Sequence, residues 1–148
     1  NIVLLEPEIP WNTGNIGRTC VATGTALHLV GRLGFKLDEK EIRRSGLDYW
    51  PKLKLFLHKD FAAFESSLPK GASLLLFSTK ARRSFWKAPY SKGGYLVFGS
   101  ESRGIPERII DRYEKNAYRI PIEEDIRSLN LSTAAGIVLY EALRQTGF

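Results

Sequence analysis

The chain has 148 residues, and this length predicts one domain covering residues 1–148. A hydrophobic fraction of 43% excludes a disordered chain, and 22 Lys and Arg residues against 16 Asp and Glu residues favour a polyanionic partner. The longest apolar runs, such as Ile2–Leu5, are far shorter than the roughly 20 residues of a membrane helix, so no membrane partner is expected. The single cysteine, Cys20, fits a reducing cytoplasm, and the lack of any Met predicts that the natural chain starts further upstream.

Short apolar runs along the chain predict strands. Most of these runs are continuous rather than alternating in polarity, which is typical of strands buried on both faces of a largely parallel sheet. The predicted strands are Ile2–Leu5, Ala26–Val30, Leu53–Leu57, Ser73–Phe77, Tyr95–Phe98 and Ala117–Ile120.

Polar stretches between these runs predict helices, because each begins with a residue that favours a helix N-terminus. The alternation of strands and helices predicts an α/β doubly wound fold with helices on both faces of the sheet. The predicted helices are 12–23 with Asn12 and Thr13 as caps, 38–46, 60–68 after Asp60, a helix that begins at Pro106, and 132–148 with Ser132 as cap.

Several familiar sites are absent from the sequence. It contains neither the G-x-G-x-x-G of a dinucleotide fold nor a P-loop, and the segment FGSESRG does not fit G-x-S-x-G. His28 and His58 are the two histidines, and neither has a carboxylate or cysteine at ligand spacing. Metal catalysis is therefore not expected. His28 lies in a strand-like run, which favours a hydrogen-bonded histidine of the core.

The segment 12–18, Asn-Thr-Gly-Asn-Ile-Gly-Arg, is unusual for a helix start. Capping explains one polar side chain, but not two Asn, two Gly and an Arg together, since a glycine inside a helix costs about 1 kcal/mol. Glycines there allow a ligand or another segment to approach closely. We interpret the segment as functional.

Two later segments join strands to helices. Residues 96–106 run from a buried strand into a Gly-rich turn, which is either a ligand loop at the carboxyl end of a sheet or an ordinary loop whose Glu101 and Ser102 cap the next helix. In residues 120–132, the polar Ser128 and Asn130 alternate with the apolar Leu129 and Leu131. Such a loop can anchor itself by its leucines and present polar groups to a ligand.

Taken together, N-x-G-N-x-G-R, FG-x-E-x-x-G and IP…RSLNLS…YE resemble the motifs of the SPOUT class of RNA methyltransferases, in its ribose 2′-O branch. The opening segment and RRSGLDYW are most similar to small members that methylate the wobble cytidine or uridine of tRNA. The resemblance implies a deep C-terminal trefoil knot, S-adenosylmethionine as cofactor with S-adenosylhomocysteine as product, no metal, and a homodimer whose RNA site is shared between chains.

The resemblance also assigns site residues by position. The implied cofactor pocket is formed by Phe77, Gly99, Ile120, Ser128 and Leu129. The implied catalytic residues are Arg18 at the reacting ribose, Glu101, Ser128, Asn130 and Tyr140.

Residues 80–92 carry five cations and three aromatic residues without an acid, a composition suited to phosphate contacts and base stacking. A solvated basic loop is the alternative. The expected RNA-binding residues are Asn12, Lys80, Arg82, Arg83 and Lys87, with Arg43, Arg44, Lys52 and Lys54 as a possible extension. Two other functions stay open: the same reaction on another tRNA or rRNA nucleotide, and a catalytically silent RNA-binding protein.

Overall fold

The computed structural model describes residues 1–37 and 49–148 of the chain. Within these ranges seven strands form one sheet in the order β3-β2-β1-β6-β4-β7-β5, and every pair of neighbours is parallel. The strands are β1 (Ile2–Leu5), β2 (Leu27–Val30), β3 (Leu55–His58), β4 (Leu74–Phe77), β5 (Arg83–Ser84), β6 (Tyr95–Phe98) and β7 (Ala117–Arg119). The helices are α1 (Pro10–Ala22), α3 (Phe61–Ser66), α4 (Glu107–Arg112) and α5 (Leu131–Thr146), with 3-10 turns η1 (Trp50–Lys52), η2 (Phe85–Lys87) and η3 (Glu114–Asn116).

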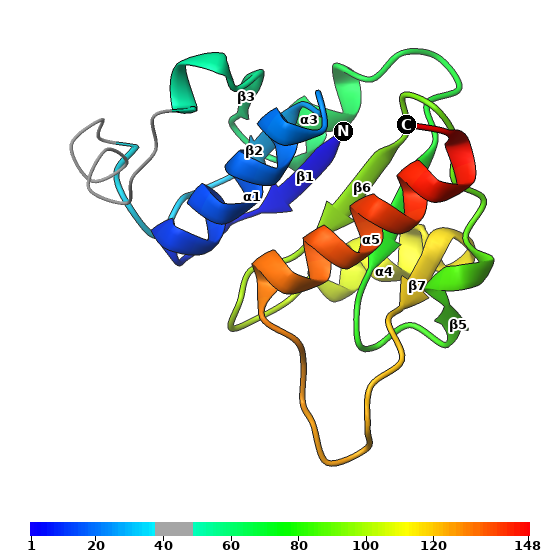
Figure 1. Ribbon diagram of the computed structural model, residues 1–148. Coiled ribbons are helices and arrows are strands. Elements are labelled where there is room, and N and C mark those ends of the chain that lie inside the picture. The colour runs from blue at the N-terminus through cyan, green and yellow to red at the C-terminus, as the bar shows by residue number, and fades with distance from the viewer. Residues whose placement is uncertain (38–48) are drawn as a thin grey trace.

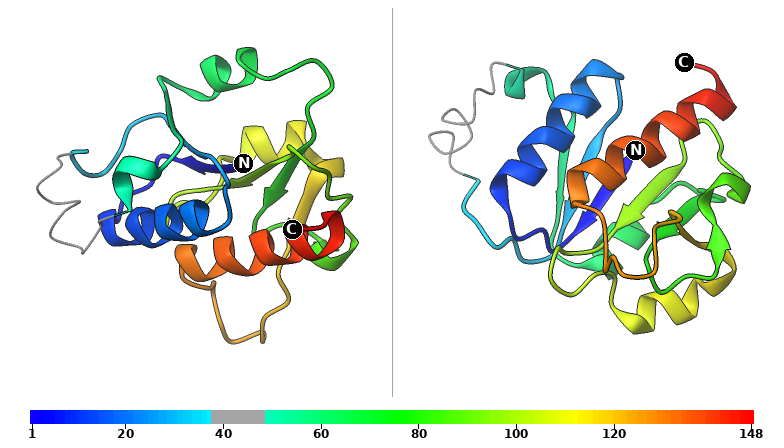
Figure 2. Two further views of the ribbon diagram at one scale, coloured as in Figure 1. Left: turned by 45° about the horizontal axis from the view of Figure 1, so that its top comes forward. Right: turned by 60° about the horizontal axis from the view of Figure 1, so that its bottom comes forward.

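The helices cover both faces of the sheet. Helices α1 and α5 lie side by side on one face, and α3 and α4 lie on the other (Figures 1 and 2). Because side chains alternate along a strand, Ile2 and Leu4 of β1 pack under α1 and α5, while Val3 and Leu5 pack under α3 and α4. The predicted α/β fold with a parallel sheet is confirmed. The trefoil knot and the extent of a single domain stay predictions.

All six predicted strands are found within two residues of their expected ends. The third differs most: β3 begins at Leu55, because Leu53 instead packs against α1, where its Cδ2 lies 3.3 Å from a Cβ built on Gly17. The two-residue strand β5 was not predicted, since a polar pair beside β7 carries no pattern of apolar residues. No helix in residues 1–37 and 49–148 is long and apolar enough to cross a membrane.

The helix caps differ more from expectation. Asp60 caps α3 as predicted, through a 2.8 Å hydrogen bond from the Ala63 amide. The predicted caps Asn12 and Thr13 are wrong, because α1 already begins at Pro10 and both side chains are buried within it. Ser132 is also wrong as a cap, since the side chain of Asn130 takes that role for α5. The predicted helix at 38–46, with Arg43 and Arg44, lies outside the described residues.

His28 is a buried, hydrogen-bonded core histidine, as predicted. Its Nε2 lies 3.3 Å from Oδ1 of Asn1, which only accepts, so Nε2 carries the proton and Nδ1 accepts from Nε2 of His58 at 3.0 Å. Phe56 stacks on the ring and Phe64 meets it edge-on. Burial, and then the nearby His58, lower the pKa of His28 to about 4, so the folded chain holds this ring neutral near pH 7.

The free energy of unfolding should therefore fall as the pH is lowered from about 6.5 to about 4. In this window the unfolded chain binds a proton at His28, whose ordinary pKa is 6.5, while the folded chain does not. The expected loss is about 3 kcal/mol, measured by urea unfolding at a series of pH values. His28→Phe keeps an aromatic ring and removes the titration, so its pH dependence should be flatter. A variant with the slope of the wild type would contradict this assignment.

Candidate functional site

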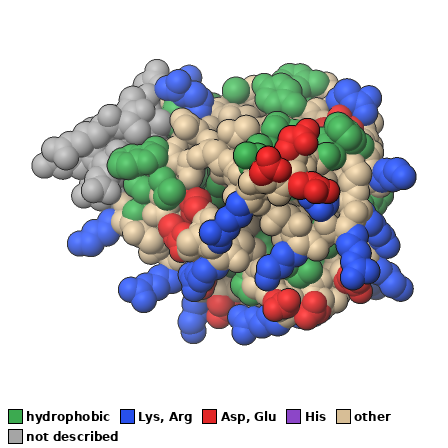
Figure 3. All heavy atoms as spheres, turned by 90° about the horizontal axis from the view of Figure 1, so that it is seen from below, with side chains coloured by type: hydrophobic (Ala, Val, Ile, Leu, Met, Phe, Trp, Pro, Cys, Tyr) green, Lys and Arg blue, Asp and Glu red, His purple; other side chains and the backbone are tan. Residues whose placement is uncertain are grey.

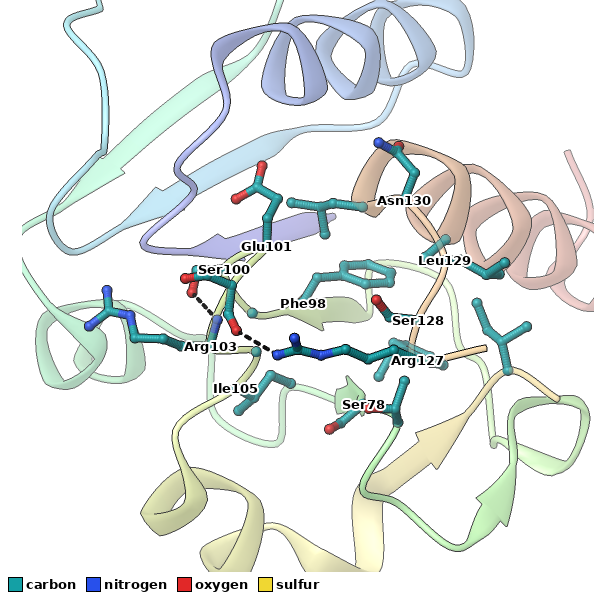
Figure 4. A pocket seen from close by; sticks show the side chains of 18 of the residues that line it. Ser78, Phe98, Ser100, Glu101, Arg103, Ile105, Arg127, Ser128, Leu129 and Asn130 are labelled. Atoms are coloured by element: carbon teal, nitrogen blue, oxygen red, sulfur yellow. Dashed lines mark hydrogen bonds between the residues drawn. The ribbon is translucent and has the colours of Figure 1, made fainter. Parts of the chain in front are cut away.

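A cavity of about 440 Å³ lies at the carboxyl ends of β4, β6 and β7. It is bounded by the loop after β4, the loop 99–105 after β6, and the loop 120–130 before α5 (Figure 4). Phe77 and Phe98, stacked 5.3 Å apart, form part of its apolar wall with Leu129, and serine hydroxyl groups of Ser78 and Ser128 line it as well. A lining that combines apolar and polar side chains suits a small molecule that has both kinds of group.

The loop 99–105 folds back on itself against the cavity. Gly104 has φ +68° and donates its amide to the Ser100 carbonyl at 2.8 Å. A Cβ at Gly99 would lie 1.9 Å from the carbonyl carbon of Gly104 and 2.1 Å from the amide nitrogen of Ile105. Position 99 therefore admits glycine alone, because both atoms in its way belong to the backbone.

Glu101 joins this loop to the start of α1. Its carboxylate accepts hydrogen bonds from the amides of Glu8 at 2.8 Å and Ile9 at 3.2 Å, and from Nδ2 of Asn12 at 3.0 Å. Ile9 is the N-cap residue of α1 and has no side-chain cap of its own. Glu101, which belongs to another loop, therefore accepts hydrogen bonds from backbone amides at the N-terminus of α1. Its negative charge there also interacts favourably with the helix dipole.

Asn12 continues the connection to α5. Its Oδ1 accepts from Nδ2 of Asn130 at 3.0 Å, and Oδ1 of Asn130 accepts from the amides of Ser132 and Thr133 at 2.9 and 3.3 Å. Because a carboxylate only accepts and backbone amides only donate, both amide side chains have one possible orientation. The Glu101–Asn12–Asn130 chain thus joins the three segments singled out in the sequence.

Further polar contacts support the same loops. Glu8 returns the contact, since its carboxylate accepts from the Ser102 amide at 3.0 Å and the Ser102 hydroxyl at 2.7 Å. These bonds lower the pKa of Glu8, so it is ionised near pH 7. Arg127 reaches across the cavity to the Ser102 carbonyl at 3.4 Å (Figure 4).

The structure brings together most of the predicted site residues. The cavity is lined by all five residues predicted for the cofactor, namely Phe77, Gly99, Ile120, Ser128 and Leu129, and also by Asn12, Lys80, Glu101 and Asn130.

Five predicted residues do not line this cavity within the described part of the chain. Arg18 lies further along α1, with Cζ over the ring of Tyr49, and Tyr140 is 56% exposed on α5. Arg82 and Lys87 are exposed beyond the cavity, and Arg83 donates to the Lys115 carbonyl.

Sequence reasoning assigned no role to two residues that the structure brings to the site. Arg127 lines the cavity, and its only sequence signal was its place directly before Ser128. Glu8 and its bond to Ser102 had no signal, because the two residues are 94 positions apart. Among the described residues, no group of three or more His, Cys, Asp or Glu residues lies close enough to hold a metal ion.

Comparison with known proteins gives consistent results. The sequence profile of the SpoU rRNA Methylase family matches residues 1–140. A protein of Saccharophagus degradans named tRNA (cytidine(34)-2'-O)-methyltransferase is 47% identical, over 100% of this chain and 96% of its own length.

Solved structures are similar over nearly the whole chain. One described as "Structural insights into the 2-OH methylation of C/U34 on tRNA" has a TM-score of 0.92 and 47% identity, covering 97% of this chain and 93% of that one. An AdoMet-bound rRNA methyltransferase from Sinorhizobium meliloti has a TM-score of 0.83 and 27% identity, covering 97% of this chain and 55% of that one.

The substitution Glu101→Gln should lower the free energy of unfolding by about 1–3 kcal/mol, because a glutamine NH2 group would face amide donors that the carboxylate now accepts. Urea unfolding measures the change. Glu114→Gln, at an exposed carboxylate on η3, removes the same charge and should leave stability within about 0.5 kcal/mol of the wild type. Equal effects of the two substitutions would mean that charge, rather than these hydrogen bonds, matters at position 101.

Proposed function

The chain belongs to the SpoU rRNA Methylase family, and from this membership we propose that it methylates the ribose 2′-hydroxyl of nucleotide 34, a cytidine or uridine, in tRNA. The observation that carries the proposal is the 47% identity to a methyltransferase of that nucleotide over the full chain. The junction of the three motif segments around one cavity supports it. The reaction takes place where tRNA is decoded, in the cytoplasm.

The cavity fits S-adenosylmethionine as methyl donor. Its aromatic and leucine side chains suit the adenine ring, and the hydroxyl groups of Ser78 and Ser128 offer hydrogen bonds to the polar groups of the donor. Phe77, Gly99, Ile120, Ser128 and Leu129 would hold the donor. When bound, S-adenosylmethionine would supply a methyl group on a positively charged sulfur. An oxygen nucleophile would attack the methyl carbon in line with the carbon–sulfur bond, and the sulfur would leave as part of S-adenosylhomocysteine.

Arg18 is the proposed residue at the reacting ribose. An arginine side chain stays protonated in proteins and only donates hydrogen bonds, so it is a poor general base. Its guanidinium instead orients the phosphate beside the ribose and stabilises the alkoxide that forms as the 2′-hydroxyl loses its proton. The proton leaves through the phosphate or water. Ser128 and Asn130 position the reacting groups from the loop before α5.

A homodimer completes the proposed site. Arg18 and Tyr140 lie outside the cavity of one chain, which supports an RNA site that uses residues of two chains. The adjacent helices α1 and α5 expose three large apolar side chains: Trp11 is 67% exposed, Ile137 39% and Tyr140 56%. Exposed apolar groups on neighbouring helices are typical of a protein interface.

The proposed RNA surface extends outward from the cavity. Lys80 lines the cavity, Arg82 and Lys87 are exposed further along the same segment, and Trp86 is 61% exposed beside them. Figure 3 views the molecule from the side where the carboxyl ends of the strands lie, and it shows Lys and Arg side chains along much of the rim of this face. These groups suit the phosphates and unpaired bases of an anticodon loop.

Incubation with labelled S-adenosylmethionine and total tRNA, followed by mapping of the modified nucleotide, tests the proposed reaction. We expect 2′-O-methylation at position 34, and label at any other nucleotide would overturn the assigned substrate.

Arg18→Ala should abolish methyl transfer and leave donor binding, measured by calorimetry, within about twofold of the wild type. Loss of both would contradict the proposed role of Arg18.

The dimer is tested by sedimentation. Ile137→Glu should shift the chain to a monomer and abolish methyl transfer, because a charge cannot be buried unpaired in an apolar interface. Phe148→Glu places the same charge at a side chain that is 88% exposed at the end of the chain, and should change neither. An active monomer would overturn the shared site.

Removing two cations tests the RNA surface. The affinity of the wild type for tRNA should fall steeply with salt, and a variant with both Arg82→Ala and Lys87→Ala should bind more weakly with a salt slope smaller by about 2. The matched control replaces Lys59 and Lys70, exposed cations on either side of α3, with alanine. Equal salt slopes for the two variants would place the RNA elsewhere.

A further inference from the structure

Tyr49 directly contacts the proposed catalytic arginine. The Cζ atom of Arg18 lies 5.2 Å from the centroid of the Tyr49 ring, within the range of a cation–π interaction. The arginine side chain is exposed, while the tyrosine is half-buried. The ring therefore forms a surface beside a long cationic side chain.

Tyr49 is itself fastened to the helix that carries Arg18. Its hydroxyl donates a short hydrogen bond, 2.5 Å, to the carbonyl of Gly14. Gly14 precedes Arg18 by four residues, so this carbonyl belongs to the same helical turn as the arginine backbone. The ring consequently keeps a constant position relative to the arginine as long as α1 is intact.

The next residue, Trp50, packs on the same helix. A Cβ at Gly17 would lie 3.2 Å from Cζ3 of Trp50 and 3.3 Å from Cδ2 of Leu53, so a side chain at position 17 would crowd the side chains of Trp50 and Leu53. Tyr49 and Trp50 thus pack together on one side of α1, where they contact Gly14, Gly17 and Arg18. This contact gives a physical reason for the glycine inside α1.

We propose that Tyr49 is a positioning residue that holds the Arg18 guanidinium for its contact with the substrate RNA. Stacking uses the face of a guanidinium, whereas hydrogen bonds to phosphate use its edge, so the two interactions are compatible. Ordering an arginine side chain costs up to about 2 kcal/mol of rotamer entropy, and a ring that restricts it beforehand lowers this cost in the complex. The inference rests on the proposed function, since it assumes that Arg18 acts on RNA.

A fluorination series separates this role from simple packing. Phenylalanine at position 49 is the reference of the series, since it and its mono-, di- and trifluoro forms all lack the hydroxyl that bonds Gly14. Each added fluorine then weakens the negative face of the ring with little change in its shape. We expect kcat/KM for tRNA to fall stepwise with each fluorine, by about 3- to 6-fold in total. The KM for S-adenosylmethionine should stay constant, because Tyr49 does not line the cavity.

The same series at Tyr113 is the matched control. Arg112 lies over that ring at 5.6 Å, in a pair at the C-terminal end of α4 that lines no part of the cavity. Fluorination there should leave methyl transfer unchanged. Thermal unfolding of each variant checks that the ring substitutions leave the fold intact.

The possible results are distinguishable. A stepwise fall at position 49 and a flat series at position 113 support the inference. An active wild type with a flat series at position 49 overturns the role of Tyr49 alone, and so does an equal fall in both series. A wild-type chain that methylates no tRNA overturns the proposed function and this inference together.

Discussion

The carboxylate of Glu101 is an acceptor surrounded by donors, and the arrangement of the site depends on it. It satisfies the amides that open α1 and fixes the amide of Asn12, which in turn fixes Asn130 at the start of α5. The side-chain amides of Asn12 and Asn130 each have one orientation, because this series of hydrogen bonds starts at a carboxylate, which only accepts, and ends at backbone amides, which only donate. The walls of the cavity are therefore held in one arrangement by a few hydrogen bonds between loops.

Close backbone approach complements these bonds. Gly99 lets the loop after β6 fold back so that the carbonyl carbon of Gly104 lies close to the backbone of residue 99. Gly17 lets Trp50 of η1 pack directly on α1. In both places the absence of a side chain lets another part of the chain pack directly against the glycine. The motif glycines thus serve as contact points between segments.

The sequence predicted the sheet well because buried parallel strands are continuous apolar runs, and Tyr95–Phe98 was found without any shift. It predicted the cap Asp60 but not the caps of α1 and α5, since Asn12 bonds to Glu101 of another loop and Asn130 caps α5 in place of Ser132. The five residues expected around the donor line one cavity because they end or follow strands whose carboxyl ends lie at one edge of the sheet. The contact between Tyr49 and Arg18 had no such pattern, because it depends on how η1 packs on α1.

The sheet order has a consequence for the synthesis of the chain. Strand β6 lies between β1 and β4, so both have an unpaired edge until residues 95–98 have left the ribosome. The bond between Asn12 and Asn130 joins residues 118 positions apart, and such long-range contacts make folding slow. The site therefore assembles late, after almost the whole chain has emerged. Chains truncated before residue 95 therefore leave strand edges of β1 and β4 unpaired, and unpaired edges favour aggregation.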